Sequence, residues 1–174
     1  MAIAYLISRE ELAVLAFFAD EQALVGFDPL PGVDAGRCES VLLGLQEKGM
    51  ALVSDEGVSL PAPLALIMRV LARPSLSVRA ENGVWAHCTA DLGVLASRAP
   101  HAPHRSRILP LPTAQELAEA LWEESGTCFD EADFDVFAEN APAAQVKLTQ
   151  QALQDLLGGV YLGEAEPDAS NVGR

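Results

Sequence analysis

The hydrophobic pattern of the first 50 residues predicts two helices. Ser8 and Glu11 have the spacing of a capping box, in which the serine hydroxyl accepts from a backbone N–H and the glutamate reaches back to the serine N–H. Apolar residues continue at helical spacing from Leu12, so the first helix is expected to begin at Ser8. A second helix is expected over residues 34–48, with an aspartate as N-cap and a glycine after its last residue.

Residues 50–74 add a hairpin and a third helix. Two short apolar runs, 50–53 and 58–60, flank an acidic turn with one glycine, which predicts a β-hairpin. The third helix is expected over 61–73, because proline is tolerated in the first turn of a helix and stops a helix elsewhere. Two helices followed by a hairpin are typical of a winged-helix unit, so residues 1–74 are predicted to be winged-helix-like.

After this segment the period of the pattern changes to two. Apolar and polar residues alternate over 76–81, and Asn82-Gly83 is a strong signal for a hairpin turn. The four expected strands cover residues 76–81, 84–89, 92–97 and 105–111. A proline- and histidine-rich loop is expected at 100–104. We therefore predict a central antiparallel sheet of about four strands with one face on the helices.

The remaining residues are expected to be mostly helical. Thr113 and Glu116 repeat the capping-box spacing at the start of one helix, and Thr149 opens the last one. Between them, Asp130 is expected to cap a short helix that carries Phe134 and Phe137.

The predicted fold class is α+β, in a single domain over residues 1–162. Its first part is the winged-helix-like segment 1–74, and its second part, 75–162, combines the antiparallel meander with the C-terminal helices. Residues 163–174 are polar and are predicted to form a flexible tail.

Composition and charge narrow the classes of partner. Half of the 174 residues are hydrophobic, so the chain can fill a core. The net charge of −14 is concentrated in the last third, with a balance of −3 over residues 1–112 and −11 over 113–174. Nucleic-acid binding requires a basic footprint, so nucleic acid is not an expected partner. An anionic membrane surface is disfavoured for the same reason.

The same sequence favours a cytoplasmic location. The N-terminus has no basic region before its apolar residues, unlike a secretory signal. No run of about 18 uncharged apolar residues predicts a membrane-spanning helix. Cys38, Cys88 and Cys128 are far apart and odd in number, which fits a reducing compartment better than a disulfide framework.

Candidate catalytic and metal-binding residues are few. His101 and His104 share a loop, but a zinc site needs three or four ligands and no third ligand clusters with them. His87 adjoins Cys88, yet neighbours on a strand point to opposite faces and cannot form a nucleophile–base pair. The three cysteines are therefore expected to be structural thiols.

The acidic residues between Glu116 and Glu139 do not indicate an acid–base site. They alternate with the apolar stripes of the expected helices, so most should face water, whereas an acid–base pair needs two contrasting environments in one cleft. Glycine-rich phosphate-binding motifs are absent from the sequence. We predict a non-enzymatic protein without cofactor or metal.

A longer pattern joins several of these segments. Ser8-x-x-Glu11-Leu12 opens a helix, Leu45-Gln-Glu-Lys-Gly49-Met50 leads into the hairpin, a helix over 64–74 ends at Arg73-Pro74, and alternating strands follow. In this order, residues 8–122 resemble the EspG-type accessory proteins of type VII secretion systems. The resemblance implies an α+β fold and a cytosolic, non-enzymatic chaperone that binds secretion substrates before export. The chain is shorter than typical members of that family, and no position matches a substrate-contacting residue of the family, so no site is carried over.

The leading functional hypothesis is a cytosolic protein-binding adaptor or chaperone-like protein. The resemblance implies that this protein is an accessory factor of type VII secretion. It would present the central sheet, or the groove between the sheet and the C-terminal helices, to a partner segment. An exposed strand edge could take an added strand, and Trp85 or Trp122 could anchor a pocket. Both tryptophans also suit core packing.

Two other hypotheses stay open. One is a winged-helix transcriptional regulator or ligand-binding domain with weak DNA affinity, because the candidate recognition helix over 34–48 holds two basic against three acidic residues. A basic face would require six arginines to gather: Arg69, Arg73, Arg79, Arg98, Arg105 and Arg107. The other is an enzyme whose Cys/His site is assembled by the fold. The sequence predicts neither the partner nor the oligomeric state.

Overall fold

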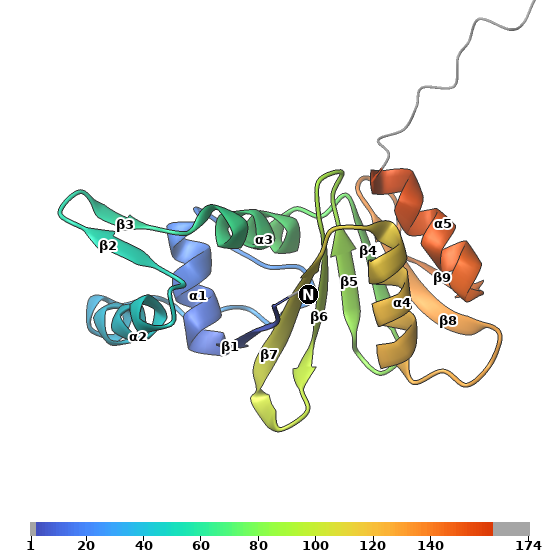
Figure 1. Ribbon diagram of the computed structural model, residues 1–174, viewed down its shortest axis with the longest axis horizontal. Coiled ribbons are helices and arrows are strands. Elements are labelled where there is room, and N and C mark those ends of the chain that lie inside the picture. Colours follow the sequence, from blue (N-terminus) through green and yellow to red (C-terminus); the bar gives the residue numbers. More distant parts are fainter. Residues whose placement is uncertain (1–2, 162–174) are drawn as a thin grey trace, which may run out of the picture.

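The computed structural model describes residues 3–161 as an antiparallel sheet with helices on both faces (Figure 1). In this part of the chain the sheet has seven strands, in the spatial order β1-β7-β6-β5-β4-β8-β9. These strands are β1 (Tyr5–Ser8), β4 (Leu76–Ala80), β5 (Trp85–Cys88), β6 (Gly93–Ala99), β7 (Ala102–Leu111), β8 (Ala132–Ala138) and β9 (Ala144–Leu148). A separate hairpin joins β2 (Leu52–Ser54) and β3 (Gly57–Ser59).

The helices lie close to their predicted positions. They are α1 (Arg9–Phe18), α2 (Ala35–Glu47), α3 (Ala62–Ala72), α4 (Ala114–Ser125) and α5 (Gln150–Tyr161). The capping box of α1 is present: Glu11 N–H donates to Ser8 Oγ at 3.2 Å, and Ser8 N–H donates to the Glu11 carboxylate at 2.8 Å. Asp34 caps α2 by accepting from a backbone N–H at 2.9 Å. These caps satisfy N–H groups that a helix cannot pair internally, which is why the sequence predicted them.

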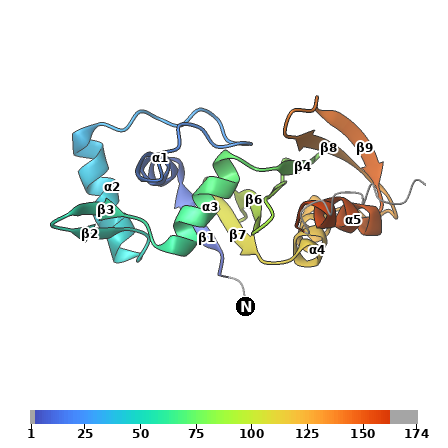
Figure 2. The same cartoon turned by 90° about the horizontal axis from the view of Figure 1, so that it is seen from above.

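The layout of the N-terminal segment differs in detail from the predicted winged helix. A strand, β1, precedes α1 and pairs with β7, so the segment is built into the main sheet. Ser8 ends this strand and also caps α1. Helix α2 lies at the periphery beside the β2–β3 hairpin, with Leu45 as its one buried residue (Figure 2). The order of helix, helix and hairpin is present, but the sheet replaces the compact winged-helix arrangement.

Two hydrophobic cores lie on opposite faces of the sheet. The first face carries Val94, Ala96 and Ile108, which pack against α1 and α3. The second face carries Val78, Ala86 and Leu95, which pack against α4 and α5. Figure 2 shows α4 and α5 together on one side of the sheet, away from α1. The central strands β5 and β6 therefore contribute to both cores, because successive residues of a strand point to opposite faces.

The predicted sheet of about four strands is wrong in number, and the error lies mainly after α4. The expected short helix with Phe134 and Phe137 is the strand β8, followed by β9. Phe134 is buried on the second face, while Asp133 and Asp135 point to the first face with Lys147 and Gln145 opposite them. The alternation of acidic and apolar residues is the period of a strand, and it outweighs the favourable cap that Asp130 would have given a helix.

The hairpin between β4 and β5 forms where Asn82-Gly83 predicted it, but its turn contains three residues. Gly83 N–H donates to the Ala80 carbonyl, Ala80 N–H donates to the Val84 carbonyl, and Gly83 has a φ of +85°. This is a type I turn followed by a left-handed residue, a common three-residue hairpin loop. The turn sets the register that places Ser77 opposite His87.

Two further predictions concern the C-terminal tail and membrane-spanning helices. The predicted flexible tail, 163–174, lies outside the described residues. Within residues 3–161, no helix has the length and apolar character needed to cross a membrane.

Candidate functional site: an open sheet face around Trp85

Trp85 lies on the first face of the sheet, at the point where helices stop covering it. It pairs with Ala96 of β6, which belongs to the first core, and with Arg79 of β4, which is exposed. The indole is only partly buried. Beyond it, among the described helices, α1 and α3 do not extend over the first face of β4, β8 and β9, while α4 and α5 pack on the second face of these strands. Trp85 thus marks the boundary between covered and open sheet.

The indole ring is held on three sides by other side chains. The guanidinium carbon of Arg79 lies 5.5 Å from the ring centroid, the geometry of a cation–π contact. The ring of Phe137 lies 5.2 Å away and the imidazole of His87 stacks at 5.4 Å with an interplanar angle of 12°. The backbone of Gly26 also approaches the ring closely, since a Cβ atom there would lie 2.8 Å from it. The tryptophan is therefore fixed in place while one part of it stays accessible.

An open hollow of about 1050 Å³ lies over Trp85. Its walls come from the loop after α1 with Gly26 and Asp28, from Arg79 on β4, and from Arg98 and Ser106 on the β6–β7 hairpin. The hollow reaches round the ends of the strands as far as Arg107 and Glu124.

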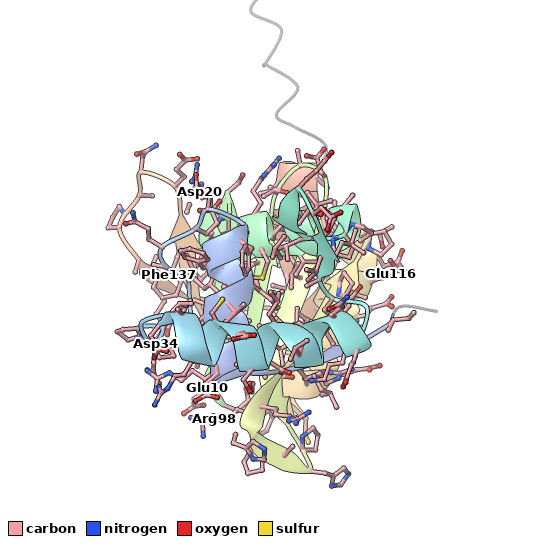
Figure 3. The ribbon with its side chains drawn as sticks, turned by 90° about the vertical axis from the view of Figure 1, so that its left-hand side faces the viewer. Glu10, Asp20, Asp34, Arg98, Glu116 and Phe137 are labelled. Atoms are coloured by element: carbon pink, nitrogen blue, oxygen red, sulfur yellow. The ribbon has the colours of Figure 1, made fainter. Side chains whose placement is uncertain are left out.

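Two smaller hollows continue along the first face. One, of about 430 Å³, lies between Arg73, Ser77 and Phe137. The other, of about 290 Å³, lies over Arg79, Asp135 and Gln145. We call the surface formed by Arg79, Trp85, Arg98, Asp135 and Phe137 the Trp85 face. Figure 3 shows Arg98 and Phe137 on the same side of the molecule, opposite Glu116 of α4.

Ion pairs set the charge of the Trp85 face. Arg79 donates through Nε to Asp135 at 3.0 Å, Arg73 is paired with Glu21, and Arg107 is paired with Glu124. Within the described part of the chain Arg98 is exposed and forms no ion pair. Three of the six arginines named for a DNA-binding face are thus already paired with carboxylates: Arg73 follows α3, while Arg79 and Arg107 lie on opposite faces of the sheet. Among residues 3–161, two exposed side chains without an ion pair line the hollow over Trp85: Arg98, and Asp28 from the loop after α1.

The second tryptophan has a different setting. Trp122 lies on α4 and packs against Phe134 of β8, with 6.0 Å between ring centroids, as part of the second core. The interface between the sheet and the C-terminal helices, suggested above as a groove, is filled by four fully buried leucines: Leu117, Leu121, Leu153 and Leu157. A hollow of about 850 Å³ opens at its end, beside the exposed Phe129. The structure therefore separates the two tryptophans, since only Trp85 borders an open sheet face.

A buried Ser–His pair lies beneath the Trp85 face, and the sequence analysis did not identify it. Ser77 Oγ lies 2.8 Å from His87 Nδ1, and both residues are buried. The His87 Nε2 atom has no hydrogen-bond partner among the described residues. Burial lowers the pKa of His87 to about 3, so the imidazole is neutral near pH 7. A catalytic pair would need an accessible hydroxyl and a third group to orient the imidazole, and this pair has neither. The sequence signals the turn at Asn82-Gly83, but the Ser77–His87 pairing depends on the three-residue length of the loop, which the sequence does not indicate.

The cysteines differ sharply in their surroundings. Cys88 is fully buried on the second face, where burial raises the pKa of its thiol to about 12. Cys38 is partly buried and Cys128 is exposed. Cys88 and His87 point to opposite faces of β5, as predicted from their adjacency. The loop expected at 100–104 is a shorter turn, because β7 begins at Ala102: His101 lies exposed in the turn and His104 lies exposed on β7. Residues 3–161 contain no group of three His, Cys, Asp or Glu side chains placed to hold a metal ion.

These surroundings predict the order in which the thiols react. We expect a maleimide at pH 7 to modify Cys128 of the native chain first and Cys38 more slowly, because the thiolate must be formed and reached. Cys88 should react only after unfolding in denaturant. Mass spectrometry of peptides after timed labelling measures this order. Rapid stoichiometric modification of Cys88 in the native chain would contradict it and revive the hypothesis of a Cys/His enzyme.

Comparison with known proteins gives no relative with which this site can be compared. No protein-family model matches the chain, and no match was found among curated proteins.

Proposed function

We propose that this chain is a non-catalytic protein-binding adaptor or chaperone-like protein that binds a segment of its partner on the Trp85 face. The observation that supports this most directly is a fixed, partly exposed indole at the floor of an open hollow of about 1050 Å³. Tryptophan and arginine are the residues most enriched among the dominant contacts of protein interfaces. Here Arg79 and Arg98 flank the tryptophan, and Gly26 and Phe137 hold it in position.

The chemistry of the face defines the kind of segment it fits. An apolar side chain of the partner would cover the exposed part of the indole, and a carboxylate would meet the unpaired guanidinium of Arg98. No helix of residues 3–161 packs on the sheet at this point, so the partner segment can be a helix or an extended chain laid across the strands. A role as an accessory factor of type VII secretion is the specific form of this proposal, and it rests on the resemblance of residues 8–122 to EspG-type proteins.

The test pairs two charge reversals that differ only in position. The tagged chain is used to capture partners from its native cytosol, and the recovered proteins are identified by mass spectrometry. We expect Arg98→Glu to lose a partner that the parent chain recovers, because the substitution repels the carboxylate of the partner. Arg69→Glu, on the exposed side of α3, is the matched control and should keep it.

Fluorescence then locates the contact on the face. In a Trp122→Phe background, Trp85 is the only tryptophan, and its emission should shift to shorter wavelength when the purified partner is added, because binding removes water from the indole. Equal loss of the partner in both charge-reversal variants, or an unchanged emission at saturating partner, would overturn the proposal.

A further inference from the structure

Strand β9 is a free edge of the large sheet. It pairs with β8 on one side, and among the described strands no other strand pairs with it. Its residues from 144 to 147 are exposed, and Leu148 is partly buried. Alternate backbone N–H and C=O groups of β9 therefore point away from the sheet with no strand to receive them.

The usual devices that protect an edge strand are largely missing from β9. Native proteins shield such edges with proline, bulges, very short strands or several charges. The strand has five residues, contains no proline, pairs with β8 without a shift in register, and carries one charged residue, Lys147. At the opposite edge, β1 has four residues and passes directly into α1. The two edges are thus built differently.

The sequence of β9 is complementary to itself when it is reversed. If two copies align antiparallel about Val146, each Val146 faces the other, Ala144 faces Leu148, and Gln145 faces Lys147. Antiparallel pairing of identical strands is a twofold, isologous contact. We propose that β9 is a self-association edge, on which a second copy of this chain adds its own β9 to form one sheet across both copies.

The neighbouring residues on β8 extend this match across both faces. On the second face, the row through Val146 joins Phe134 and Val146 of one copy to Val146 and Phe134 of the other, so apolar side chains meet apolar ones. On the first face, Asp135 and Gln145 of one copy line up with Lys147 and Asp133 of the other. Gln145 of one copy then faces Lys147 of the other across the junction, and the carboxylate of Asp133 lies on the far side of each Lys147 within its own copy. Such cross-strand pairs are the unit by which sheets are stabilised.

The charge of Lys147 disfavours one alternative register. A pairing centred on Lys147 would place two ammonium groups directly opposite each other, and like charges at opposed positions destabilise a strand pair. The pairing centred on Val146 uses all five residues and opposes no like charges. The net charge of −14 on each copy opposes association at low ionic strength, so the dimer should become stronger as salt is added.

The test combines a mass measurement with register-specific cross-linking. The join of two five-residue strands is smaller than a standard interface of about 1,600 Å², so we expect a reversible dimer at roughly micromolar to tens of micromolar chain. Sedimentation equilibrium in 0.15 M and 0.5 M salt measures it. In a Cys128→Ser background, Val146→Cys should form a disulfide between copies, because directly opposed Cα atoms in antiparallel strands lie about 4.5–5.5 Å apart.

Two matched controls make the test specific. Ala144→Cys is equally exposed, but its counterpart in the second copy lies four residues away along the strand, about 14 Å, so it should cross-link at least about tenfold more slowly. Val146→Lys places like charges across the axis and should weaken the dimer by about tenfold, whereas Val53→Lys, on the β2–β3 hairpin, should leave it unchanged. Three outcomes would each overturn the proposal. The first is a chain that stays monomeric at 200 µM, taken as roughly ten times the expected range. The others are equal cross-linking at 144 and 146, and a dimer that is insensitive to Val146→Lys.

Discussion

Gly93→Ala is expected to lower the free energy of unfolding by about 3 kcal/mol, although it adds a single methyl group. Gly93 begins β6 on the second face, where α5 ends above it. A Cβ atom at this position would lie 1.9 Å from Tyr161 Oη and 2.7 Å from Leu117 Cδ2. Tyr161 would have to move, and it would lose the hydrogen bond that its hydroxyl donates to the Leu111 carbonyl at 3.2 Å. Urea unfolding followed by circular dichroism measures the loss.

Two further variants show whether the collision is the cause. Gly158→Ala, inside α5, meets nothing within 4 Å, so it should stabilise the chain by up to about 1 kcal/mol through its helix propensity. Tyr161→Phe removes the atom nearest to the added methyl group, so the double variant Gly93→Ala/Tyr161→Phe should lose less than the sum of the two single changes. Strict additivity would show that the methyl group does not meet Tyr161.

The second large effect is a loss of stability in acid that depends on His87. Burial lowers its pKa from 6.5 to about 3, so between these values the unfolded chain binds a proton that the folded chain does not. The contribution is fully present above pH 6.5 and falls by about 1.4 kcal/mol per pH unit as the pH decreases towards 3. Ser77 and Trp85 contact the ring, and neither carries a charge that would stabilise the imidazolium.

The measurement is the free energy of unfolding in urea at pH 7, 6, 5 and 4 for the parent chain and for His87→Leu. We expect the parent to lose more stability than His87→Leu over this range, with the two curves separating below pH 6.5. His101→Leu, at the exposed β6–β7 turn, is the matched control and should follow the parent. Carboxylates contribute to the acid sensitivity of all three chains, so only the difference between curves reports on His87. Parallel curves for the parent and His87→Leu would contradict the assignment.

The local elements were largely predictable because their signals are short-range. The capping residues Ser8 and Asp34 mark the starts of α1 and α2 in the sequence as they do in the structure. The turn at Asn82-Gly83 was also predictable, but its length was not. A two-residue loop would have placed Ser77 opposite Cys88, whereas the three-residue loop places it opposite His87 and creates the buried pair.

Strands β8 and β9 were missed because two signals compete in the same residues. Phe134 and Phe137 are three residues apart, as on a helix, while Phe134 and Val136 alternate with two aspartates, as on a strand. Pairing with β4, more than fifty residues earlier, decides the outcome, and no local signal reports such a contact. The edge strand β9 has too few apolar residues to be recognised without its partner.

The candidate site could be anticipated only as far as one residue. Trp85 was named from its size and chemistry, but its surroundings come from four separate segments: the loop at Gly26, β4 at Arg79, β6 at Arg98 and β8 at Phe137. Trp122 carried the same signal and lies in the second core. What separates them is which face of the sheet each one meets, and that follows from the topology rather than from the residue.

The division of the core between two faces also sets the order in which the chain can fold as it is made. Every residue of the first core lies between Tyr5 and Ile108, so that core can close once β7 has left the ribosome. The second face cannot be covered until α4 and α5 follow, because Leu117, Leu153 and Leu157 complete it. During this interval the growing chain exposes the apolar side of β4, β5 and β6 to solvent. Helices α4 and α5 then cover this surface, so the second core is complete only when α5 has been made.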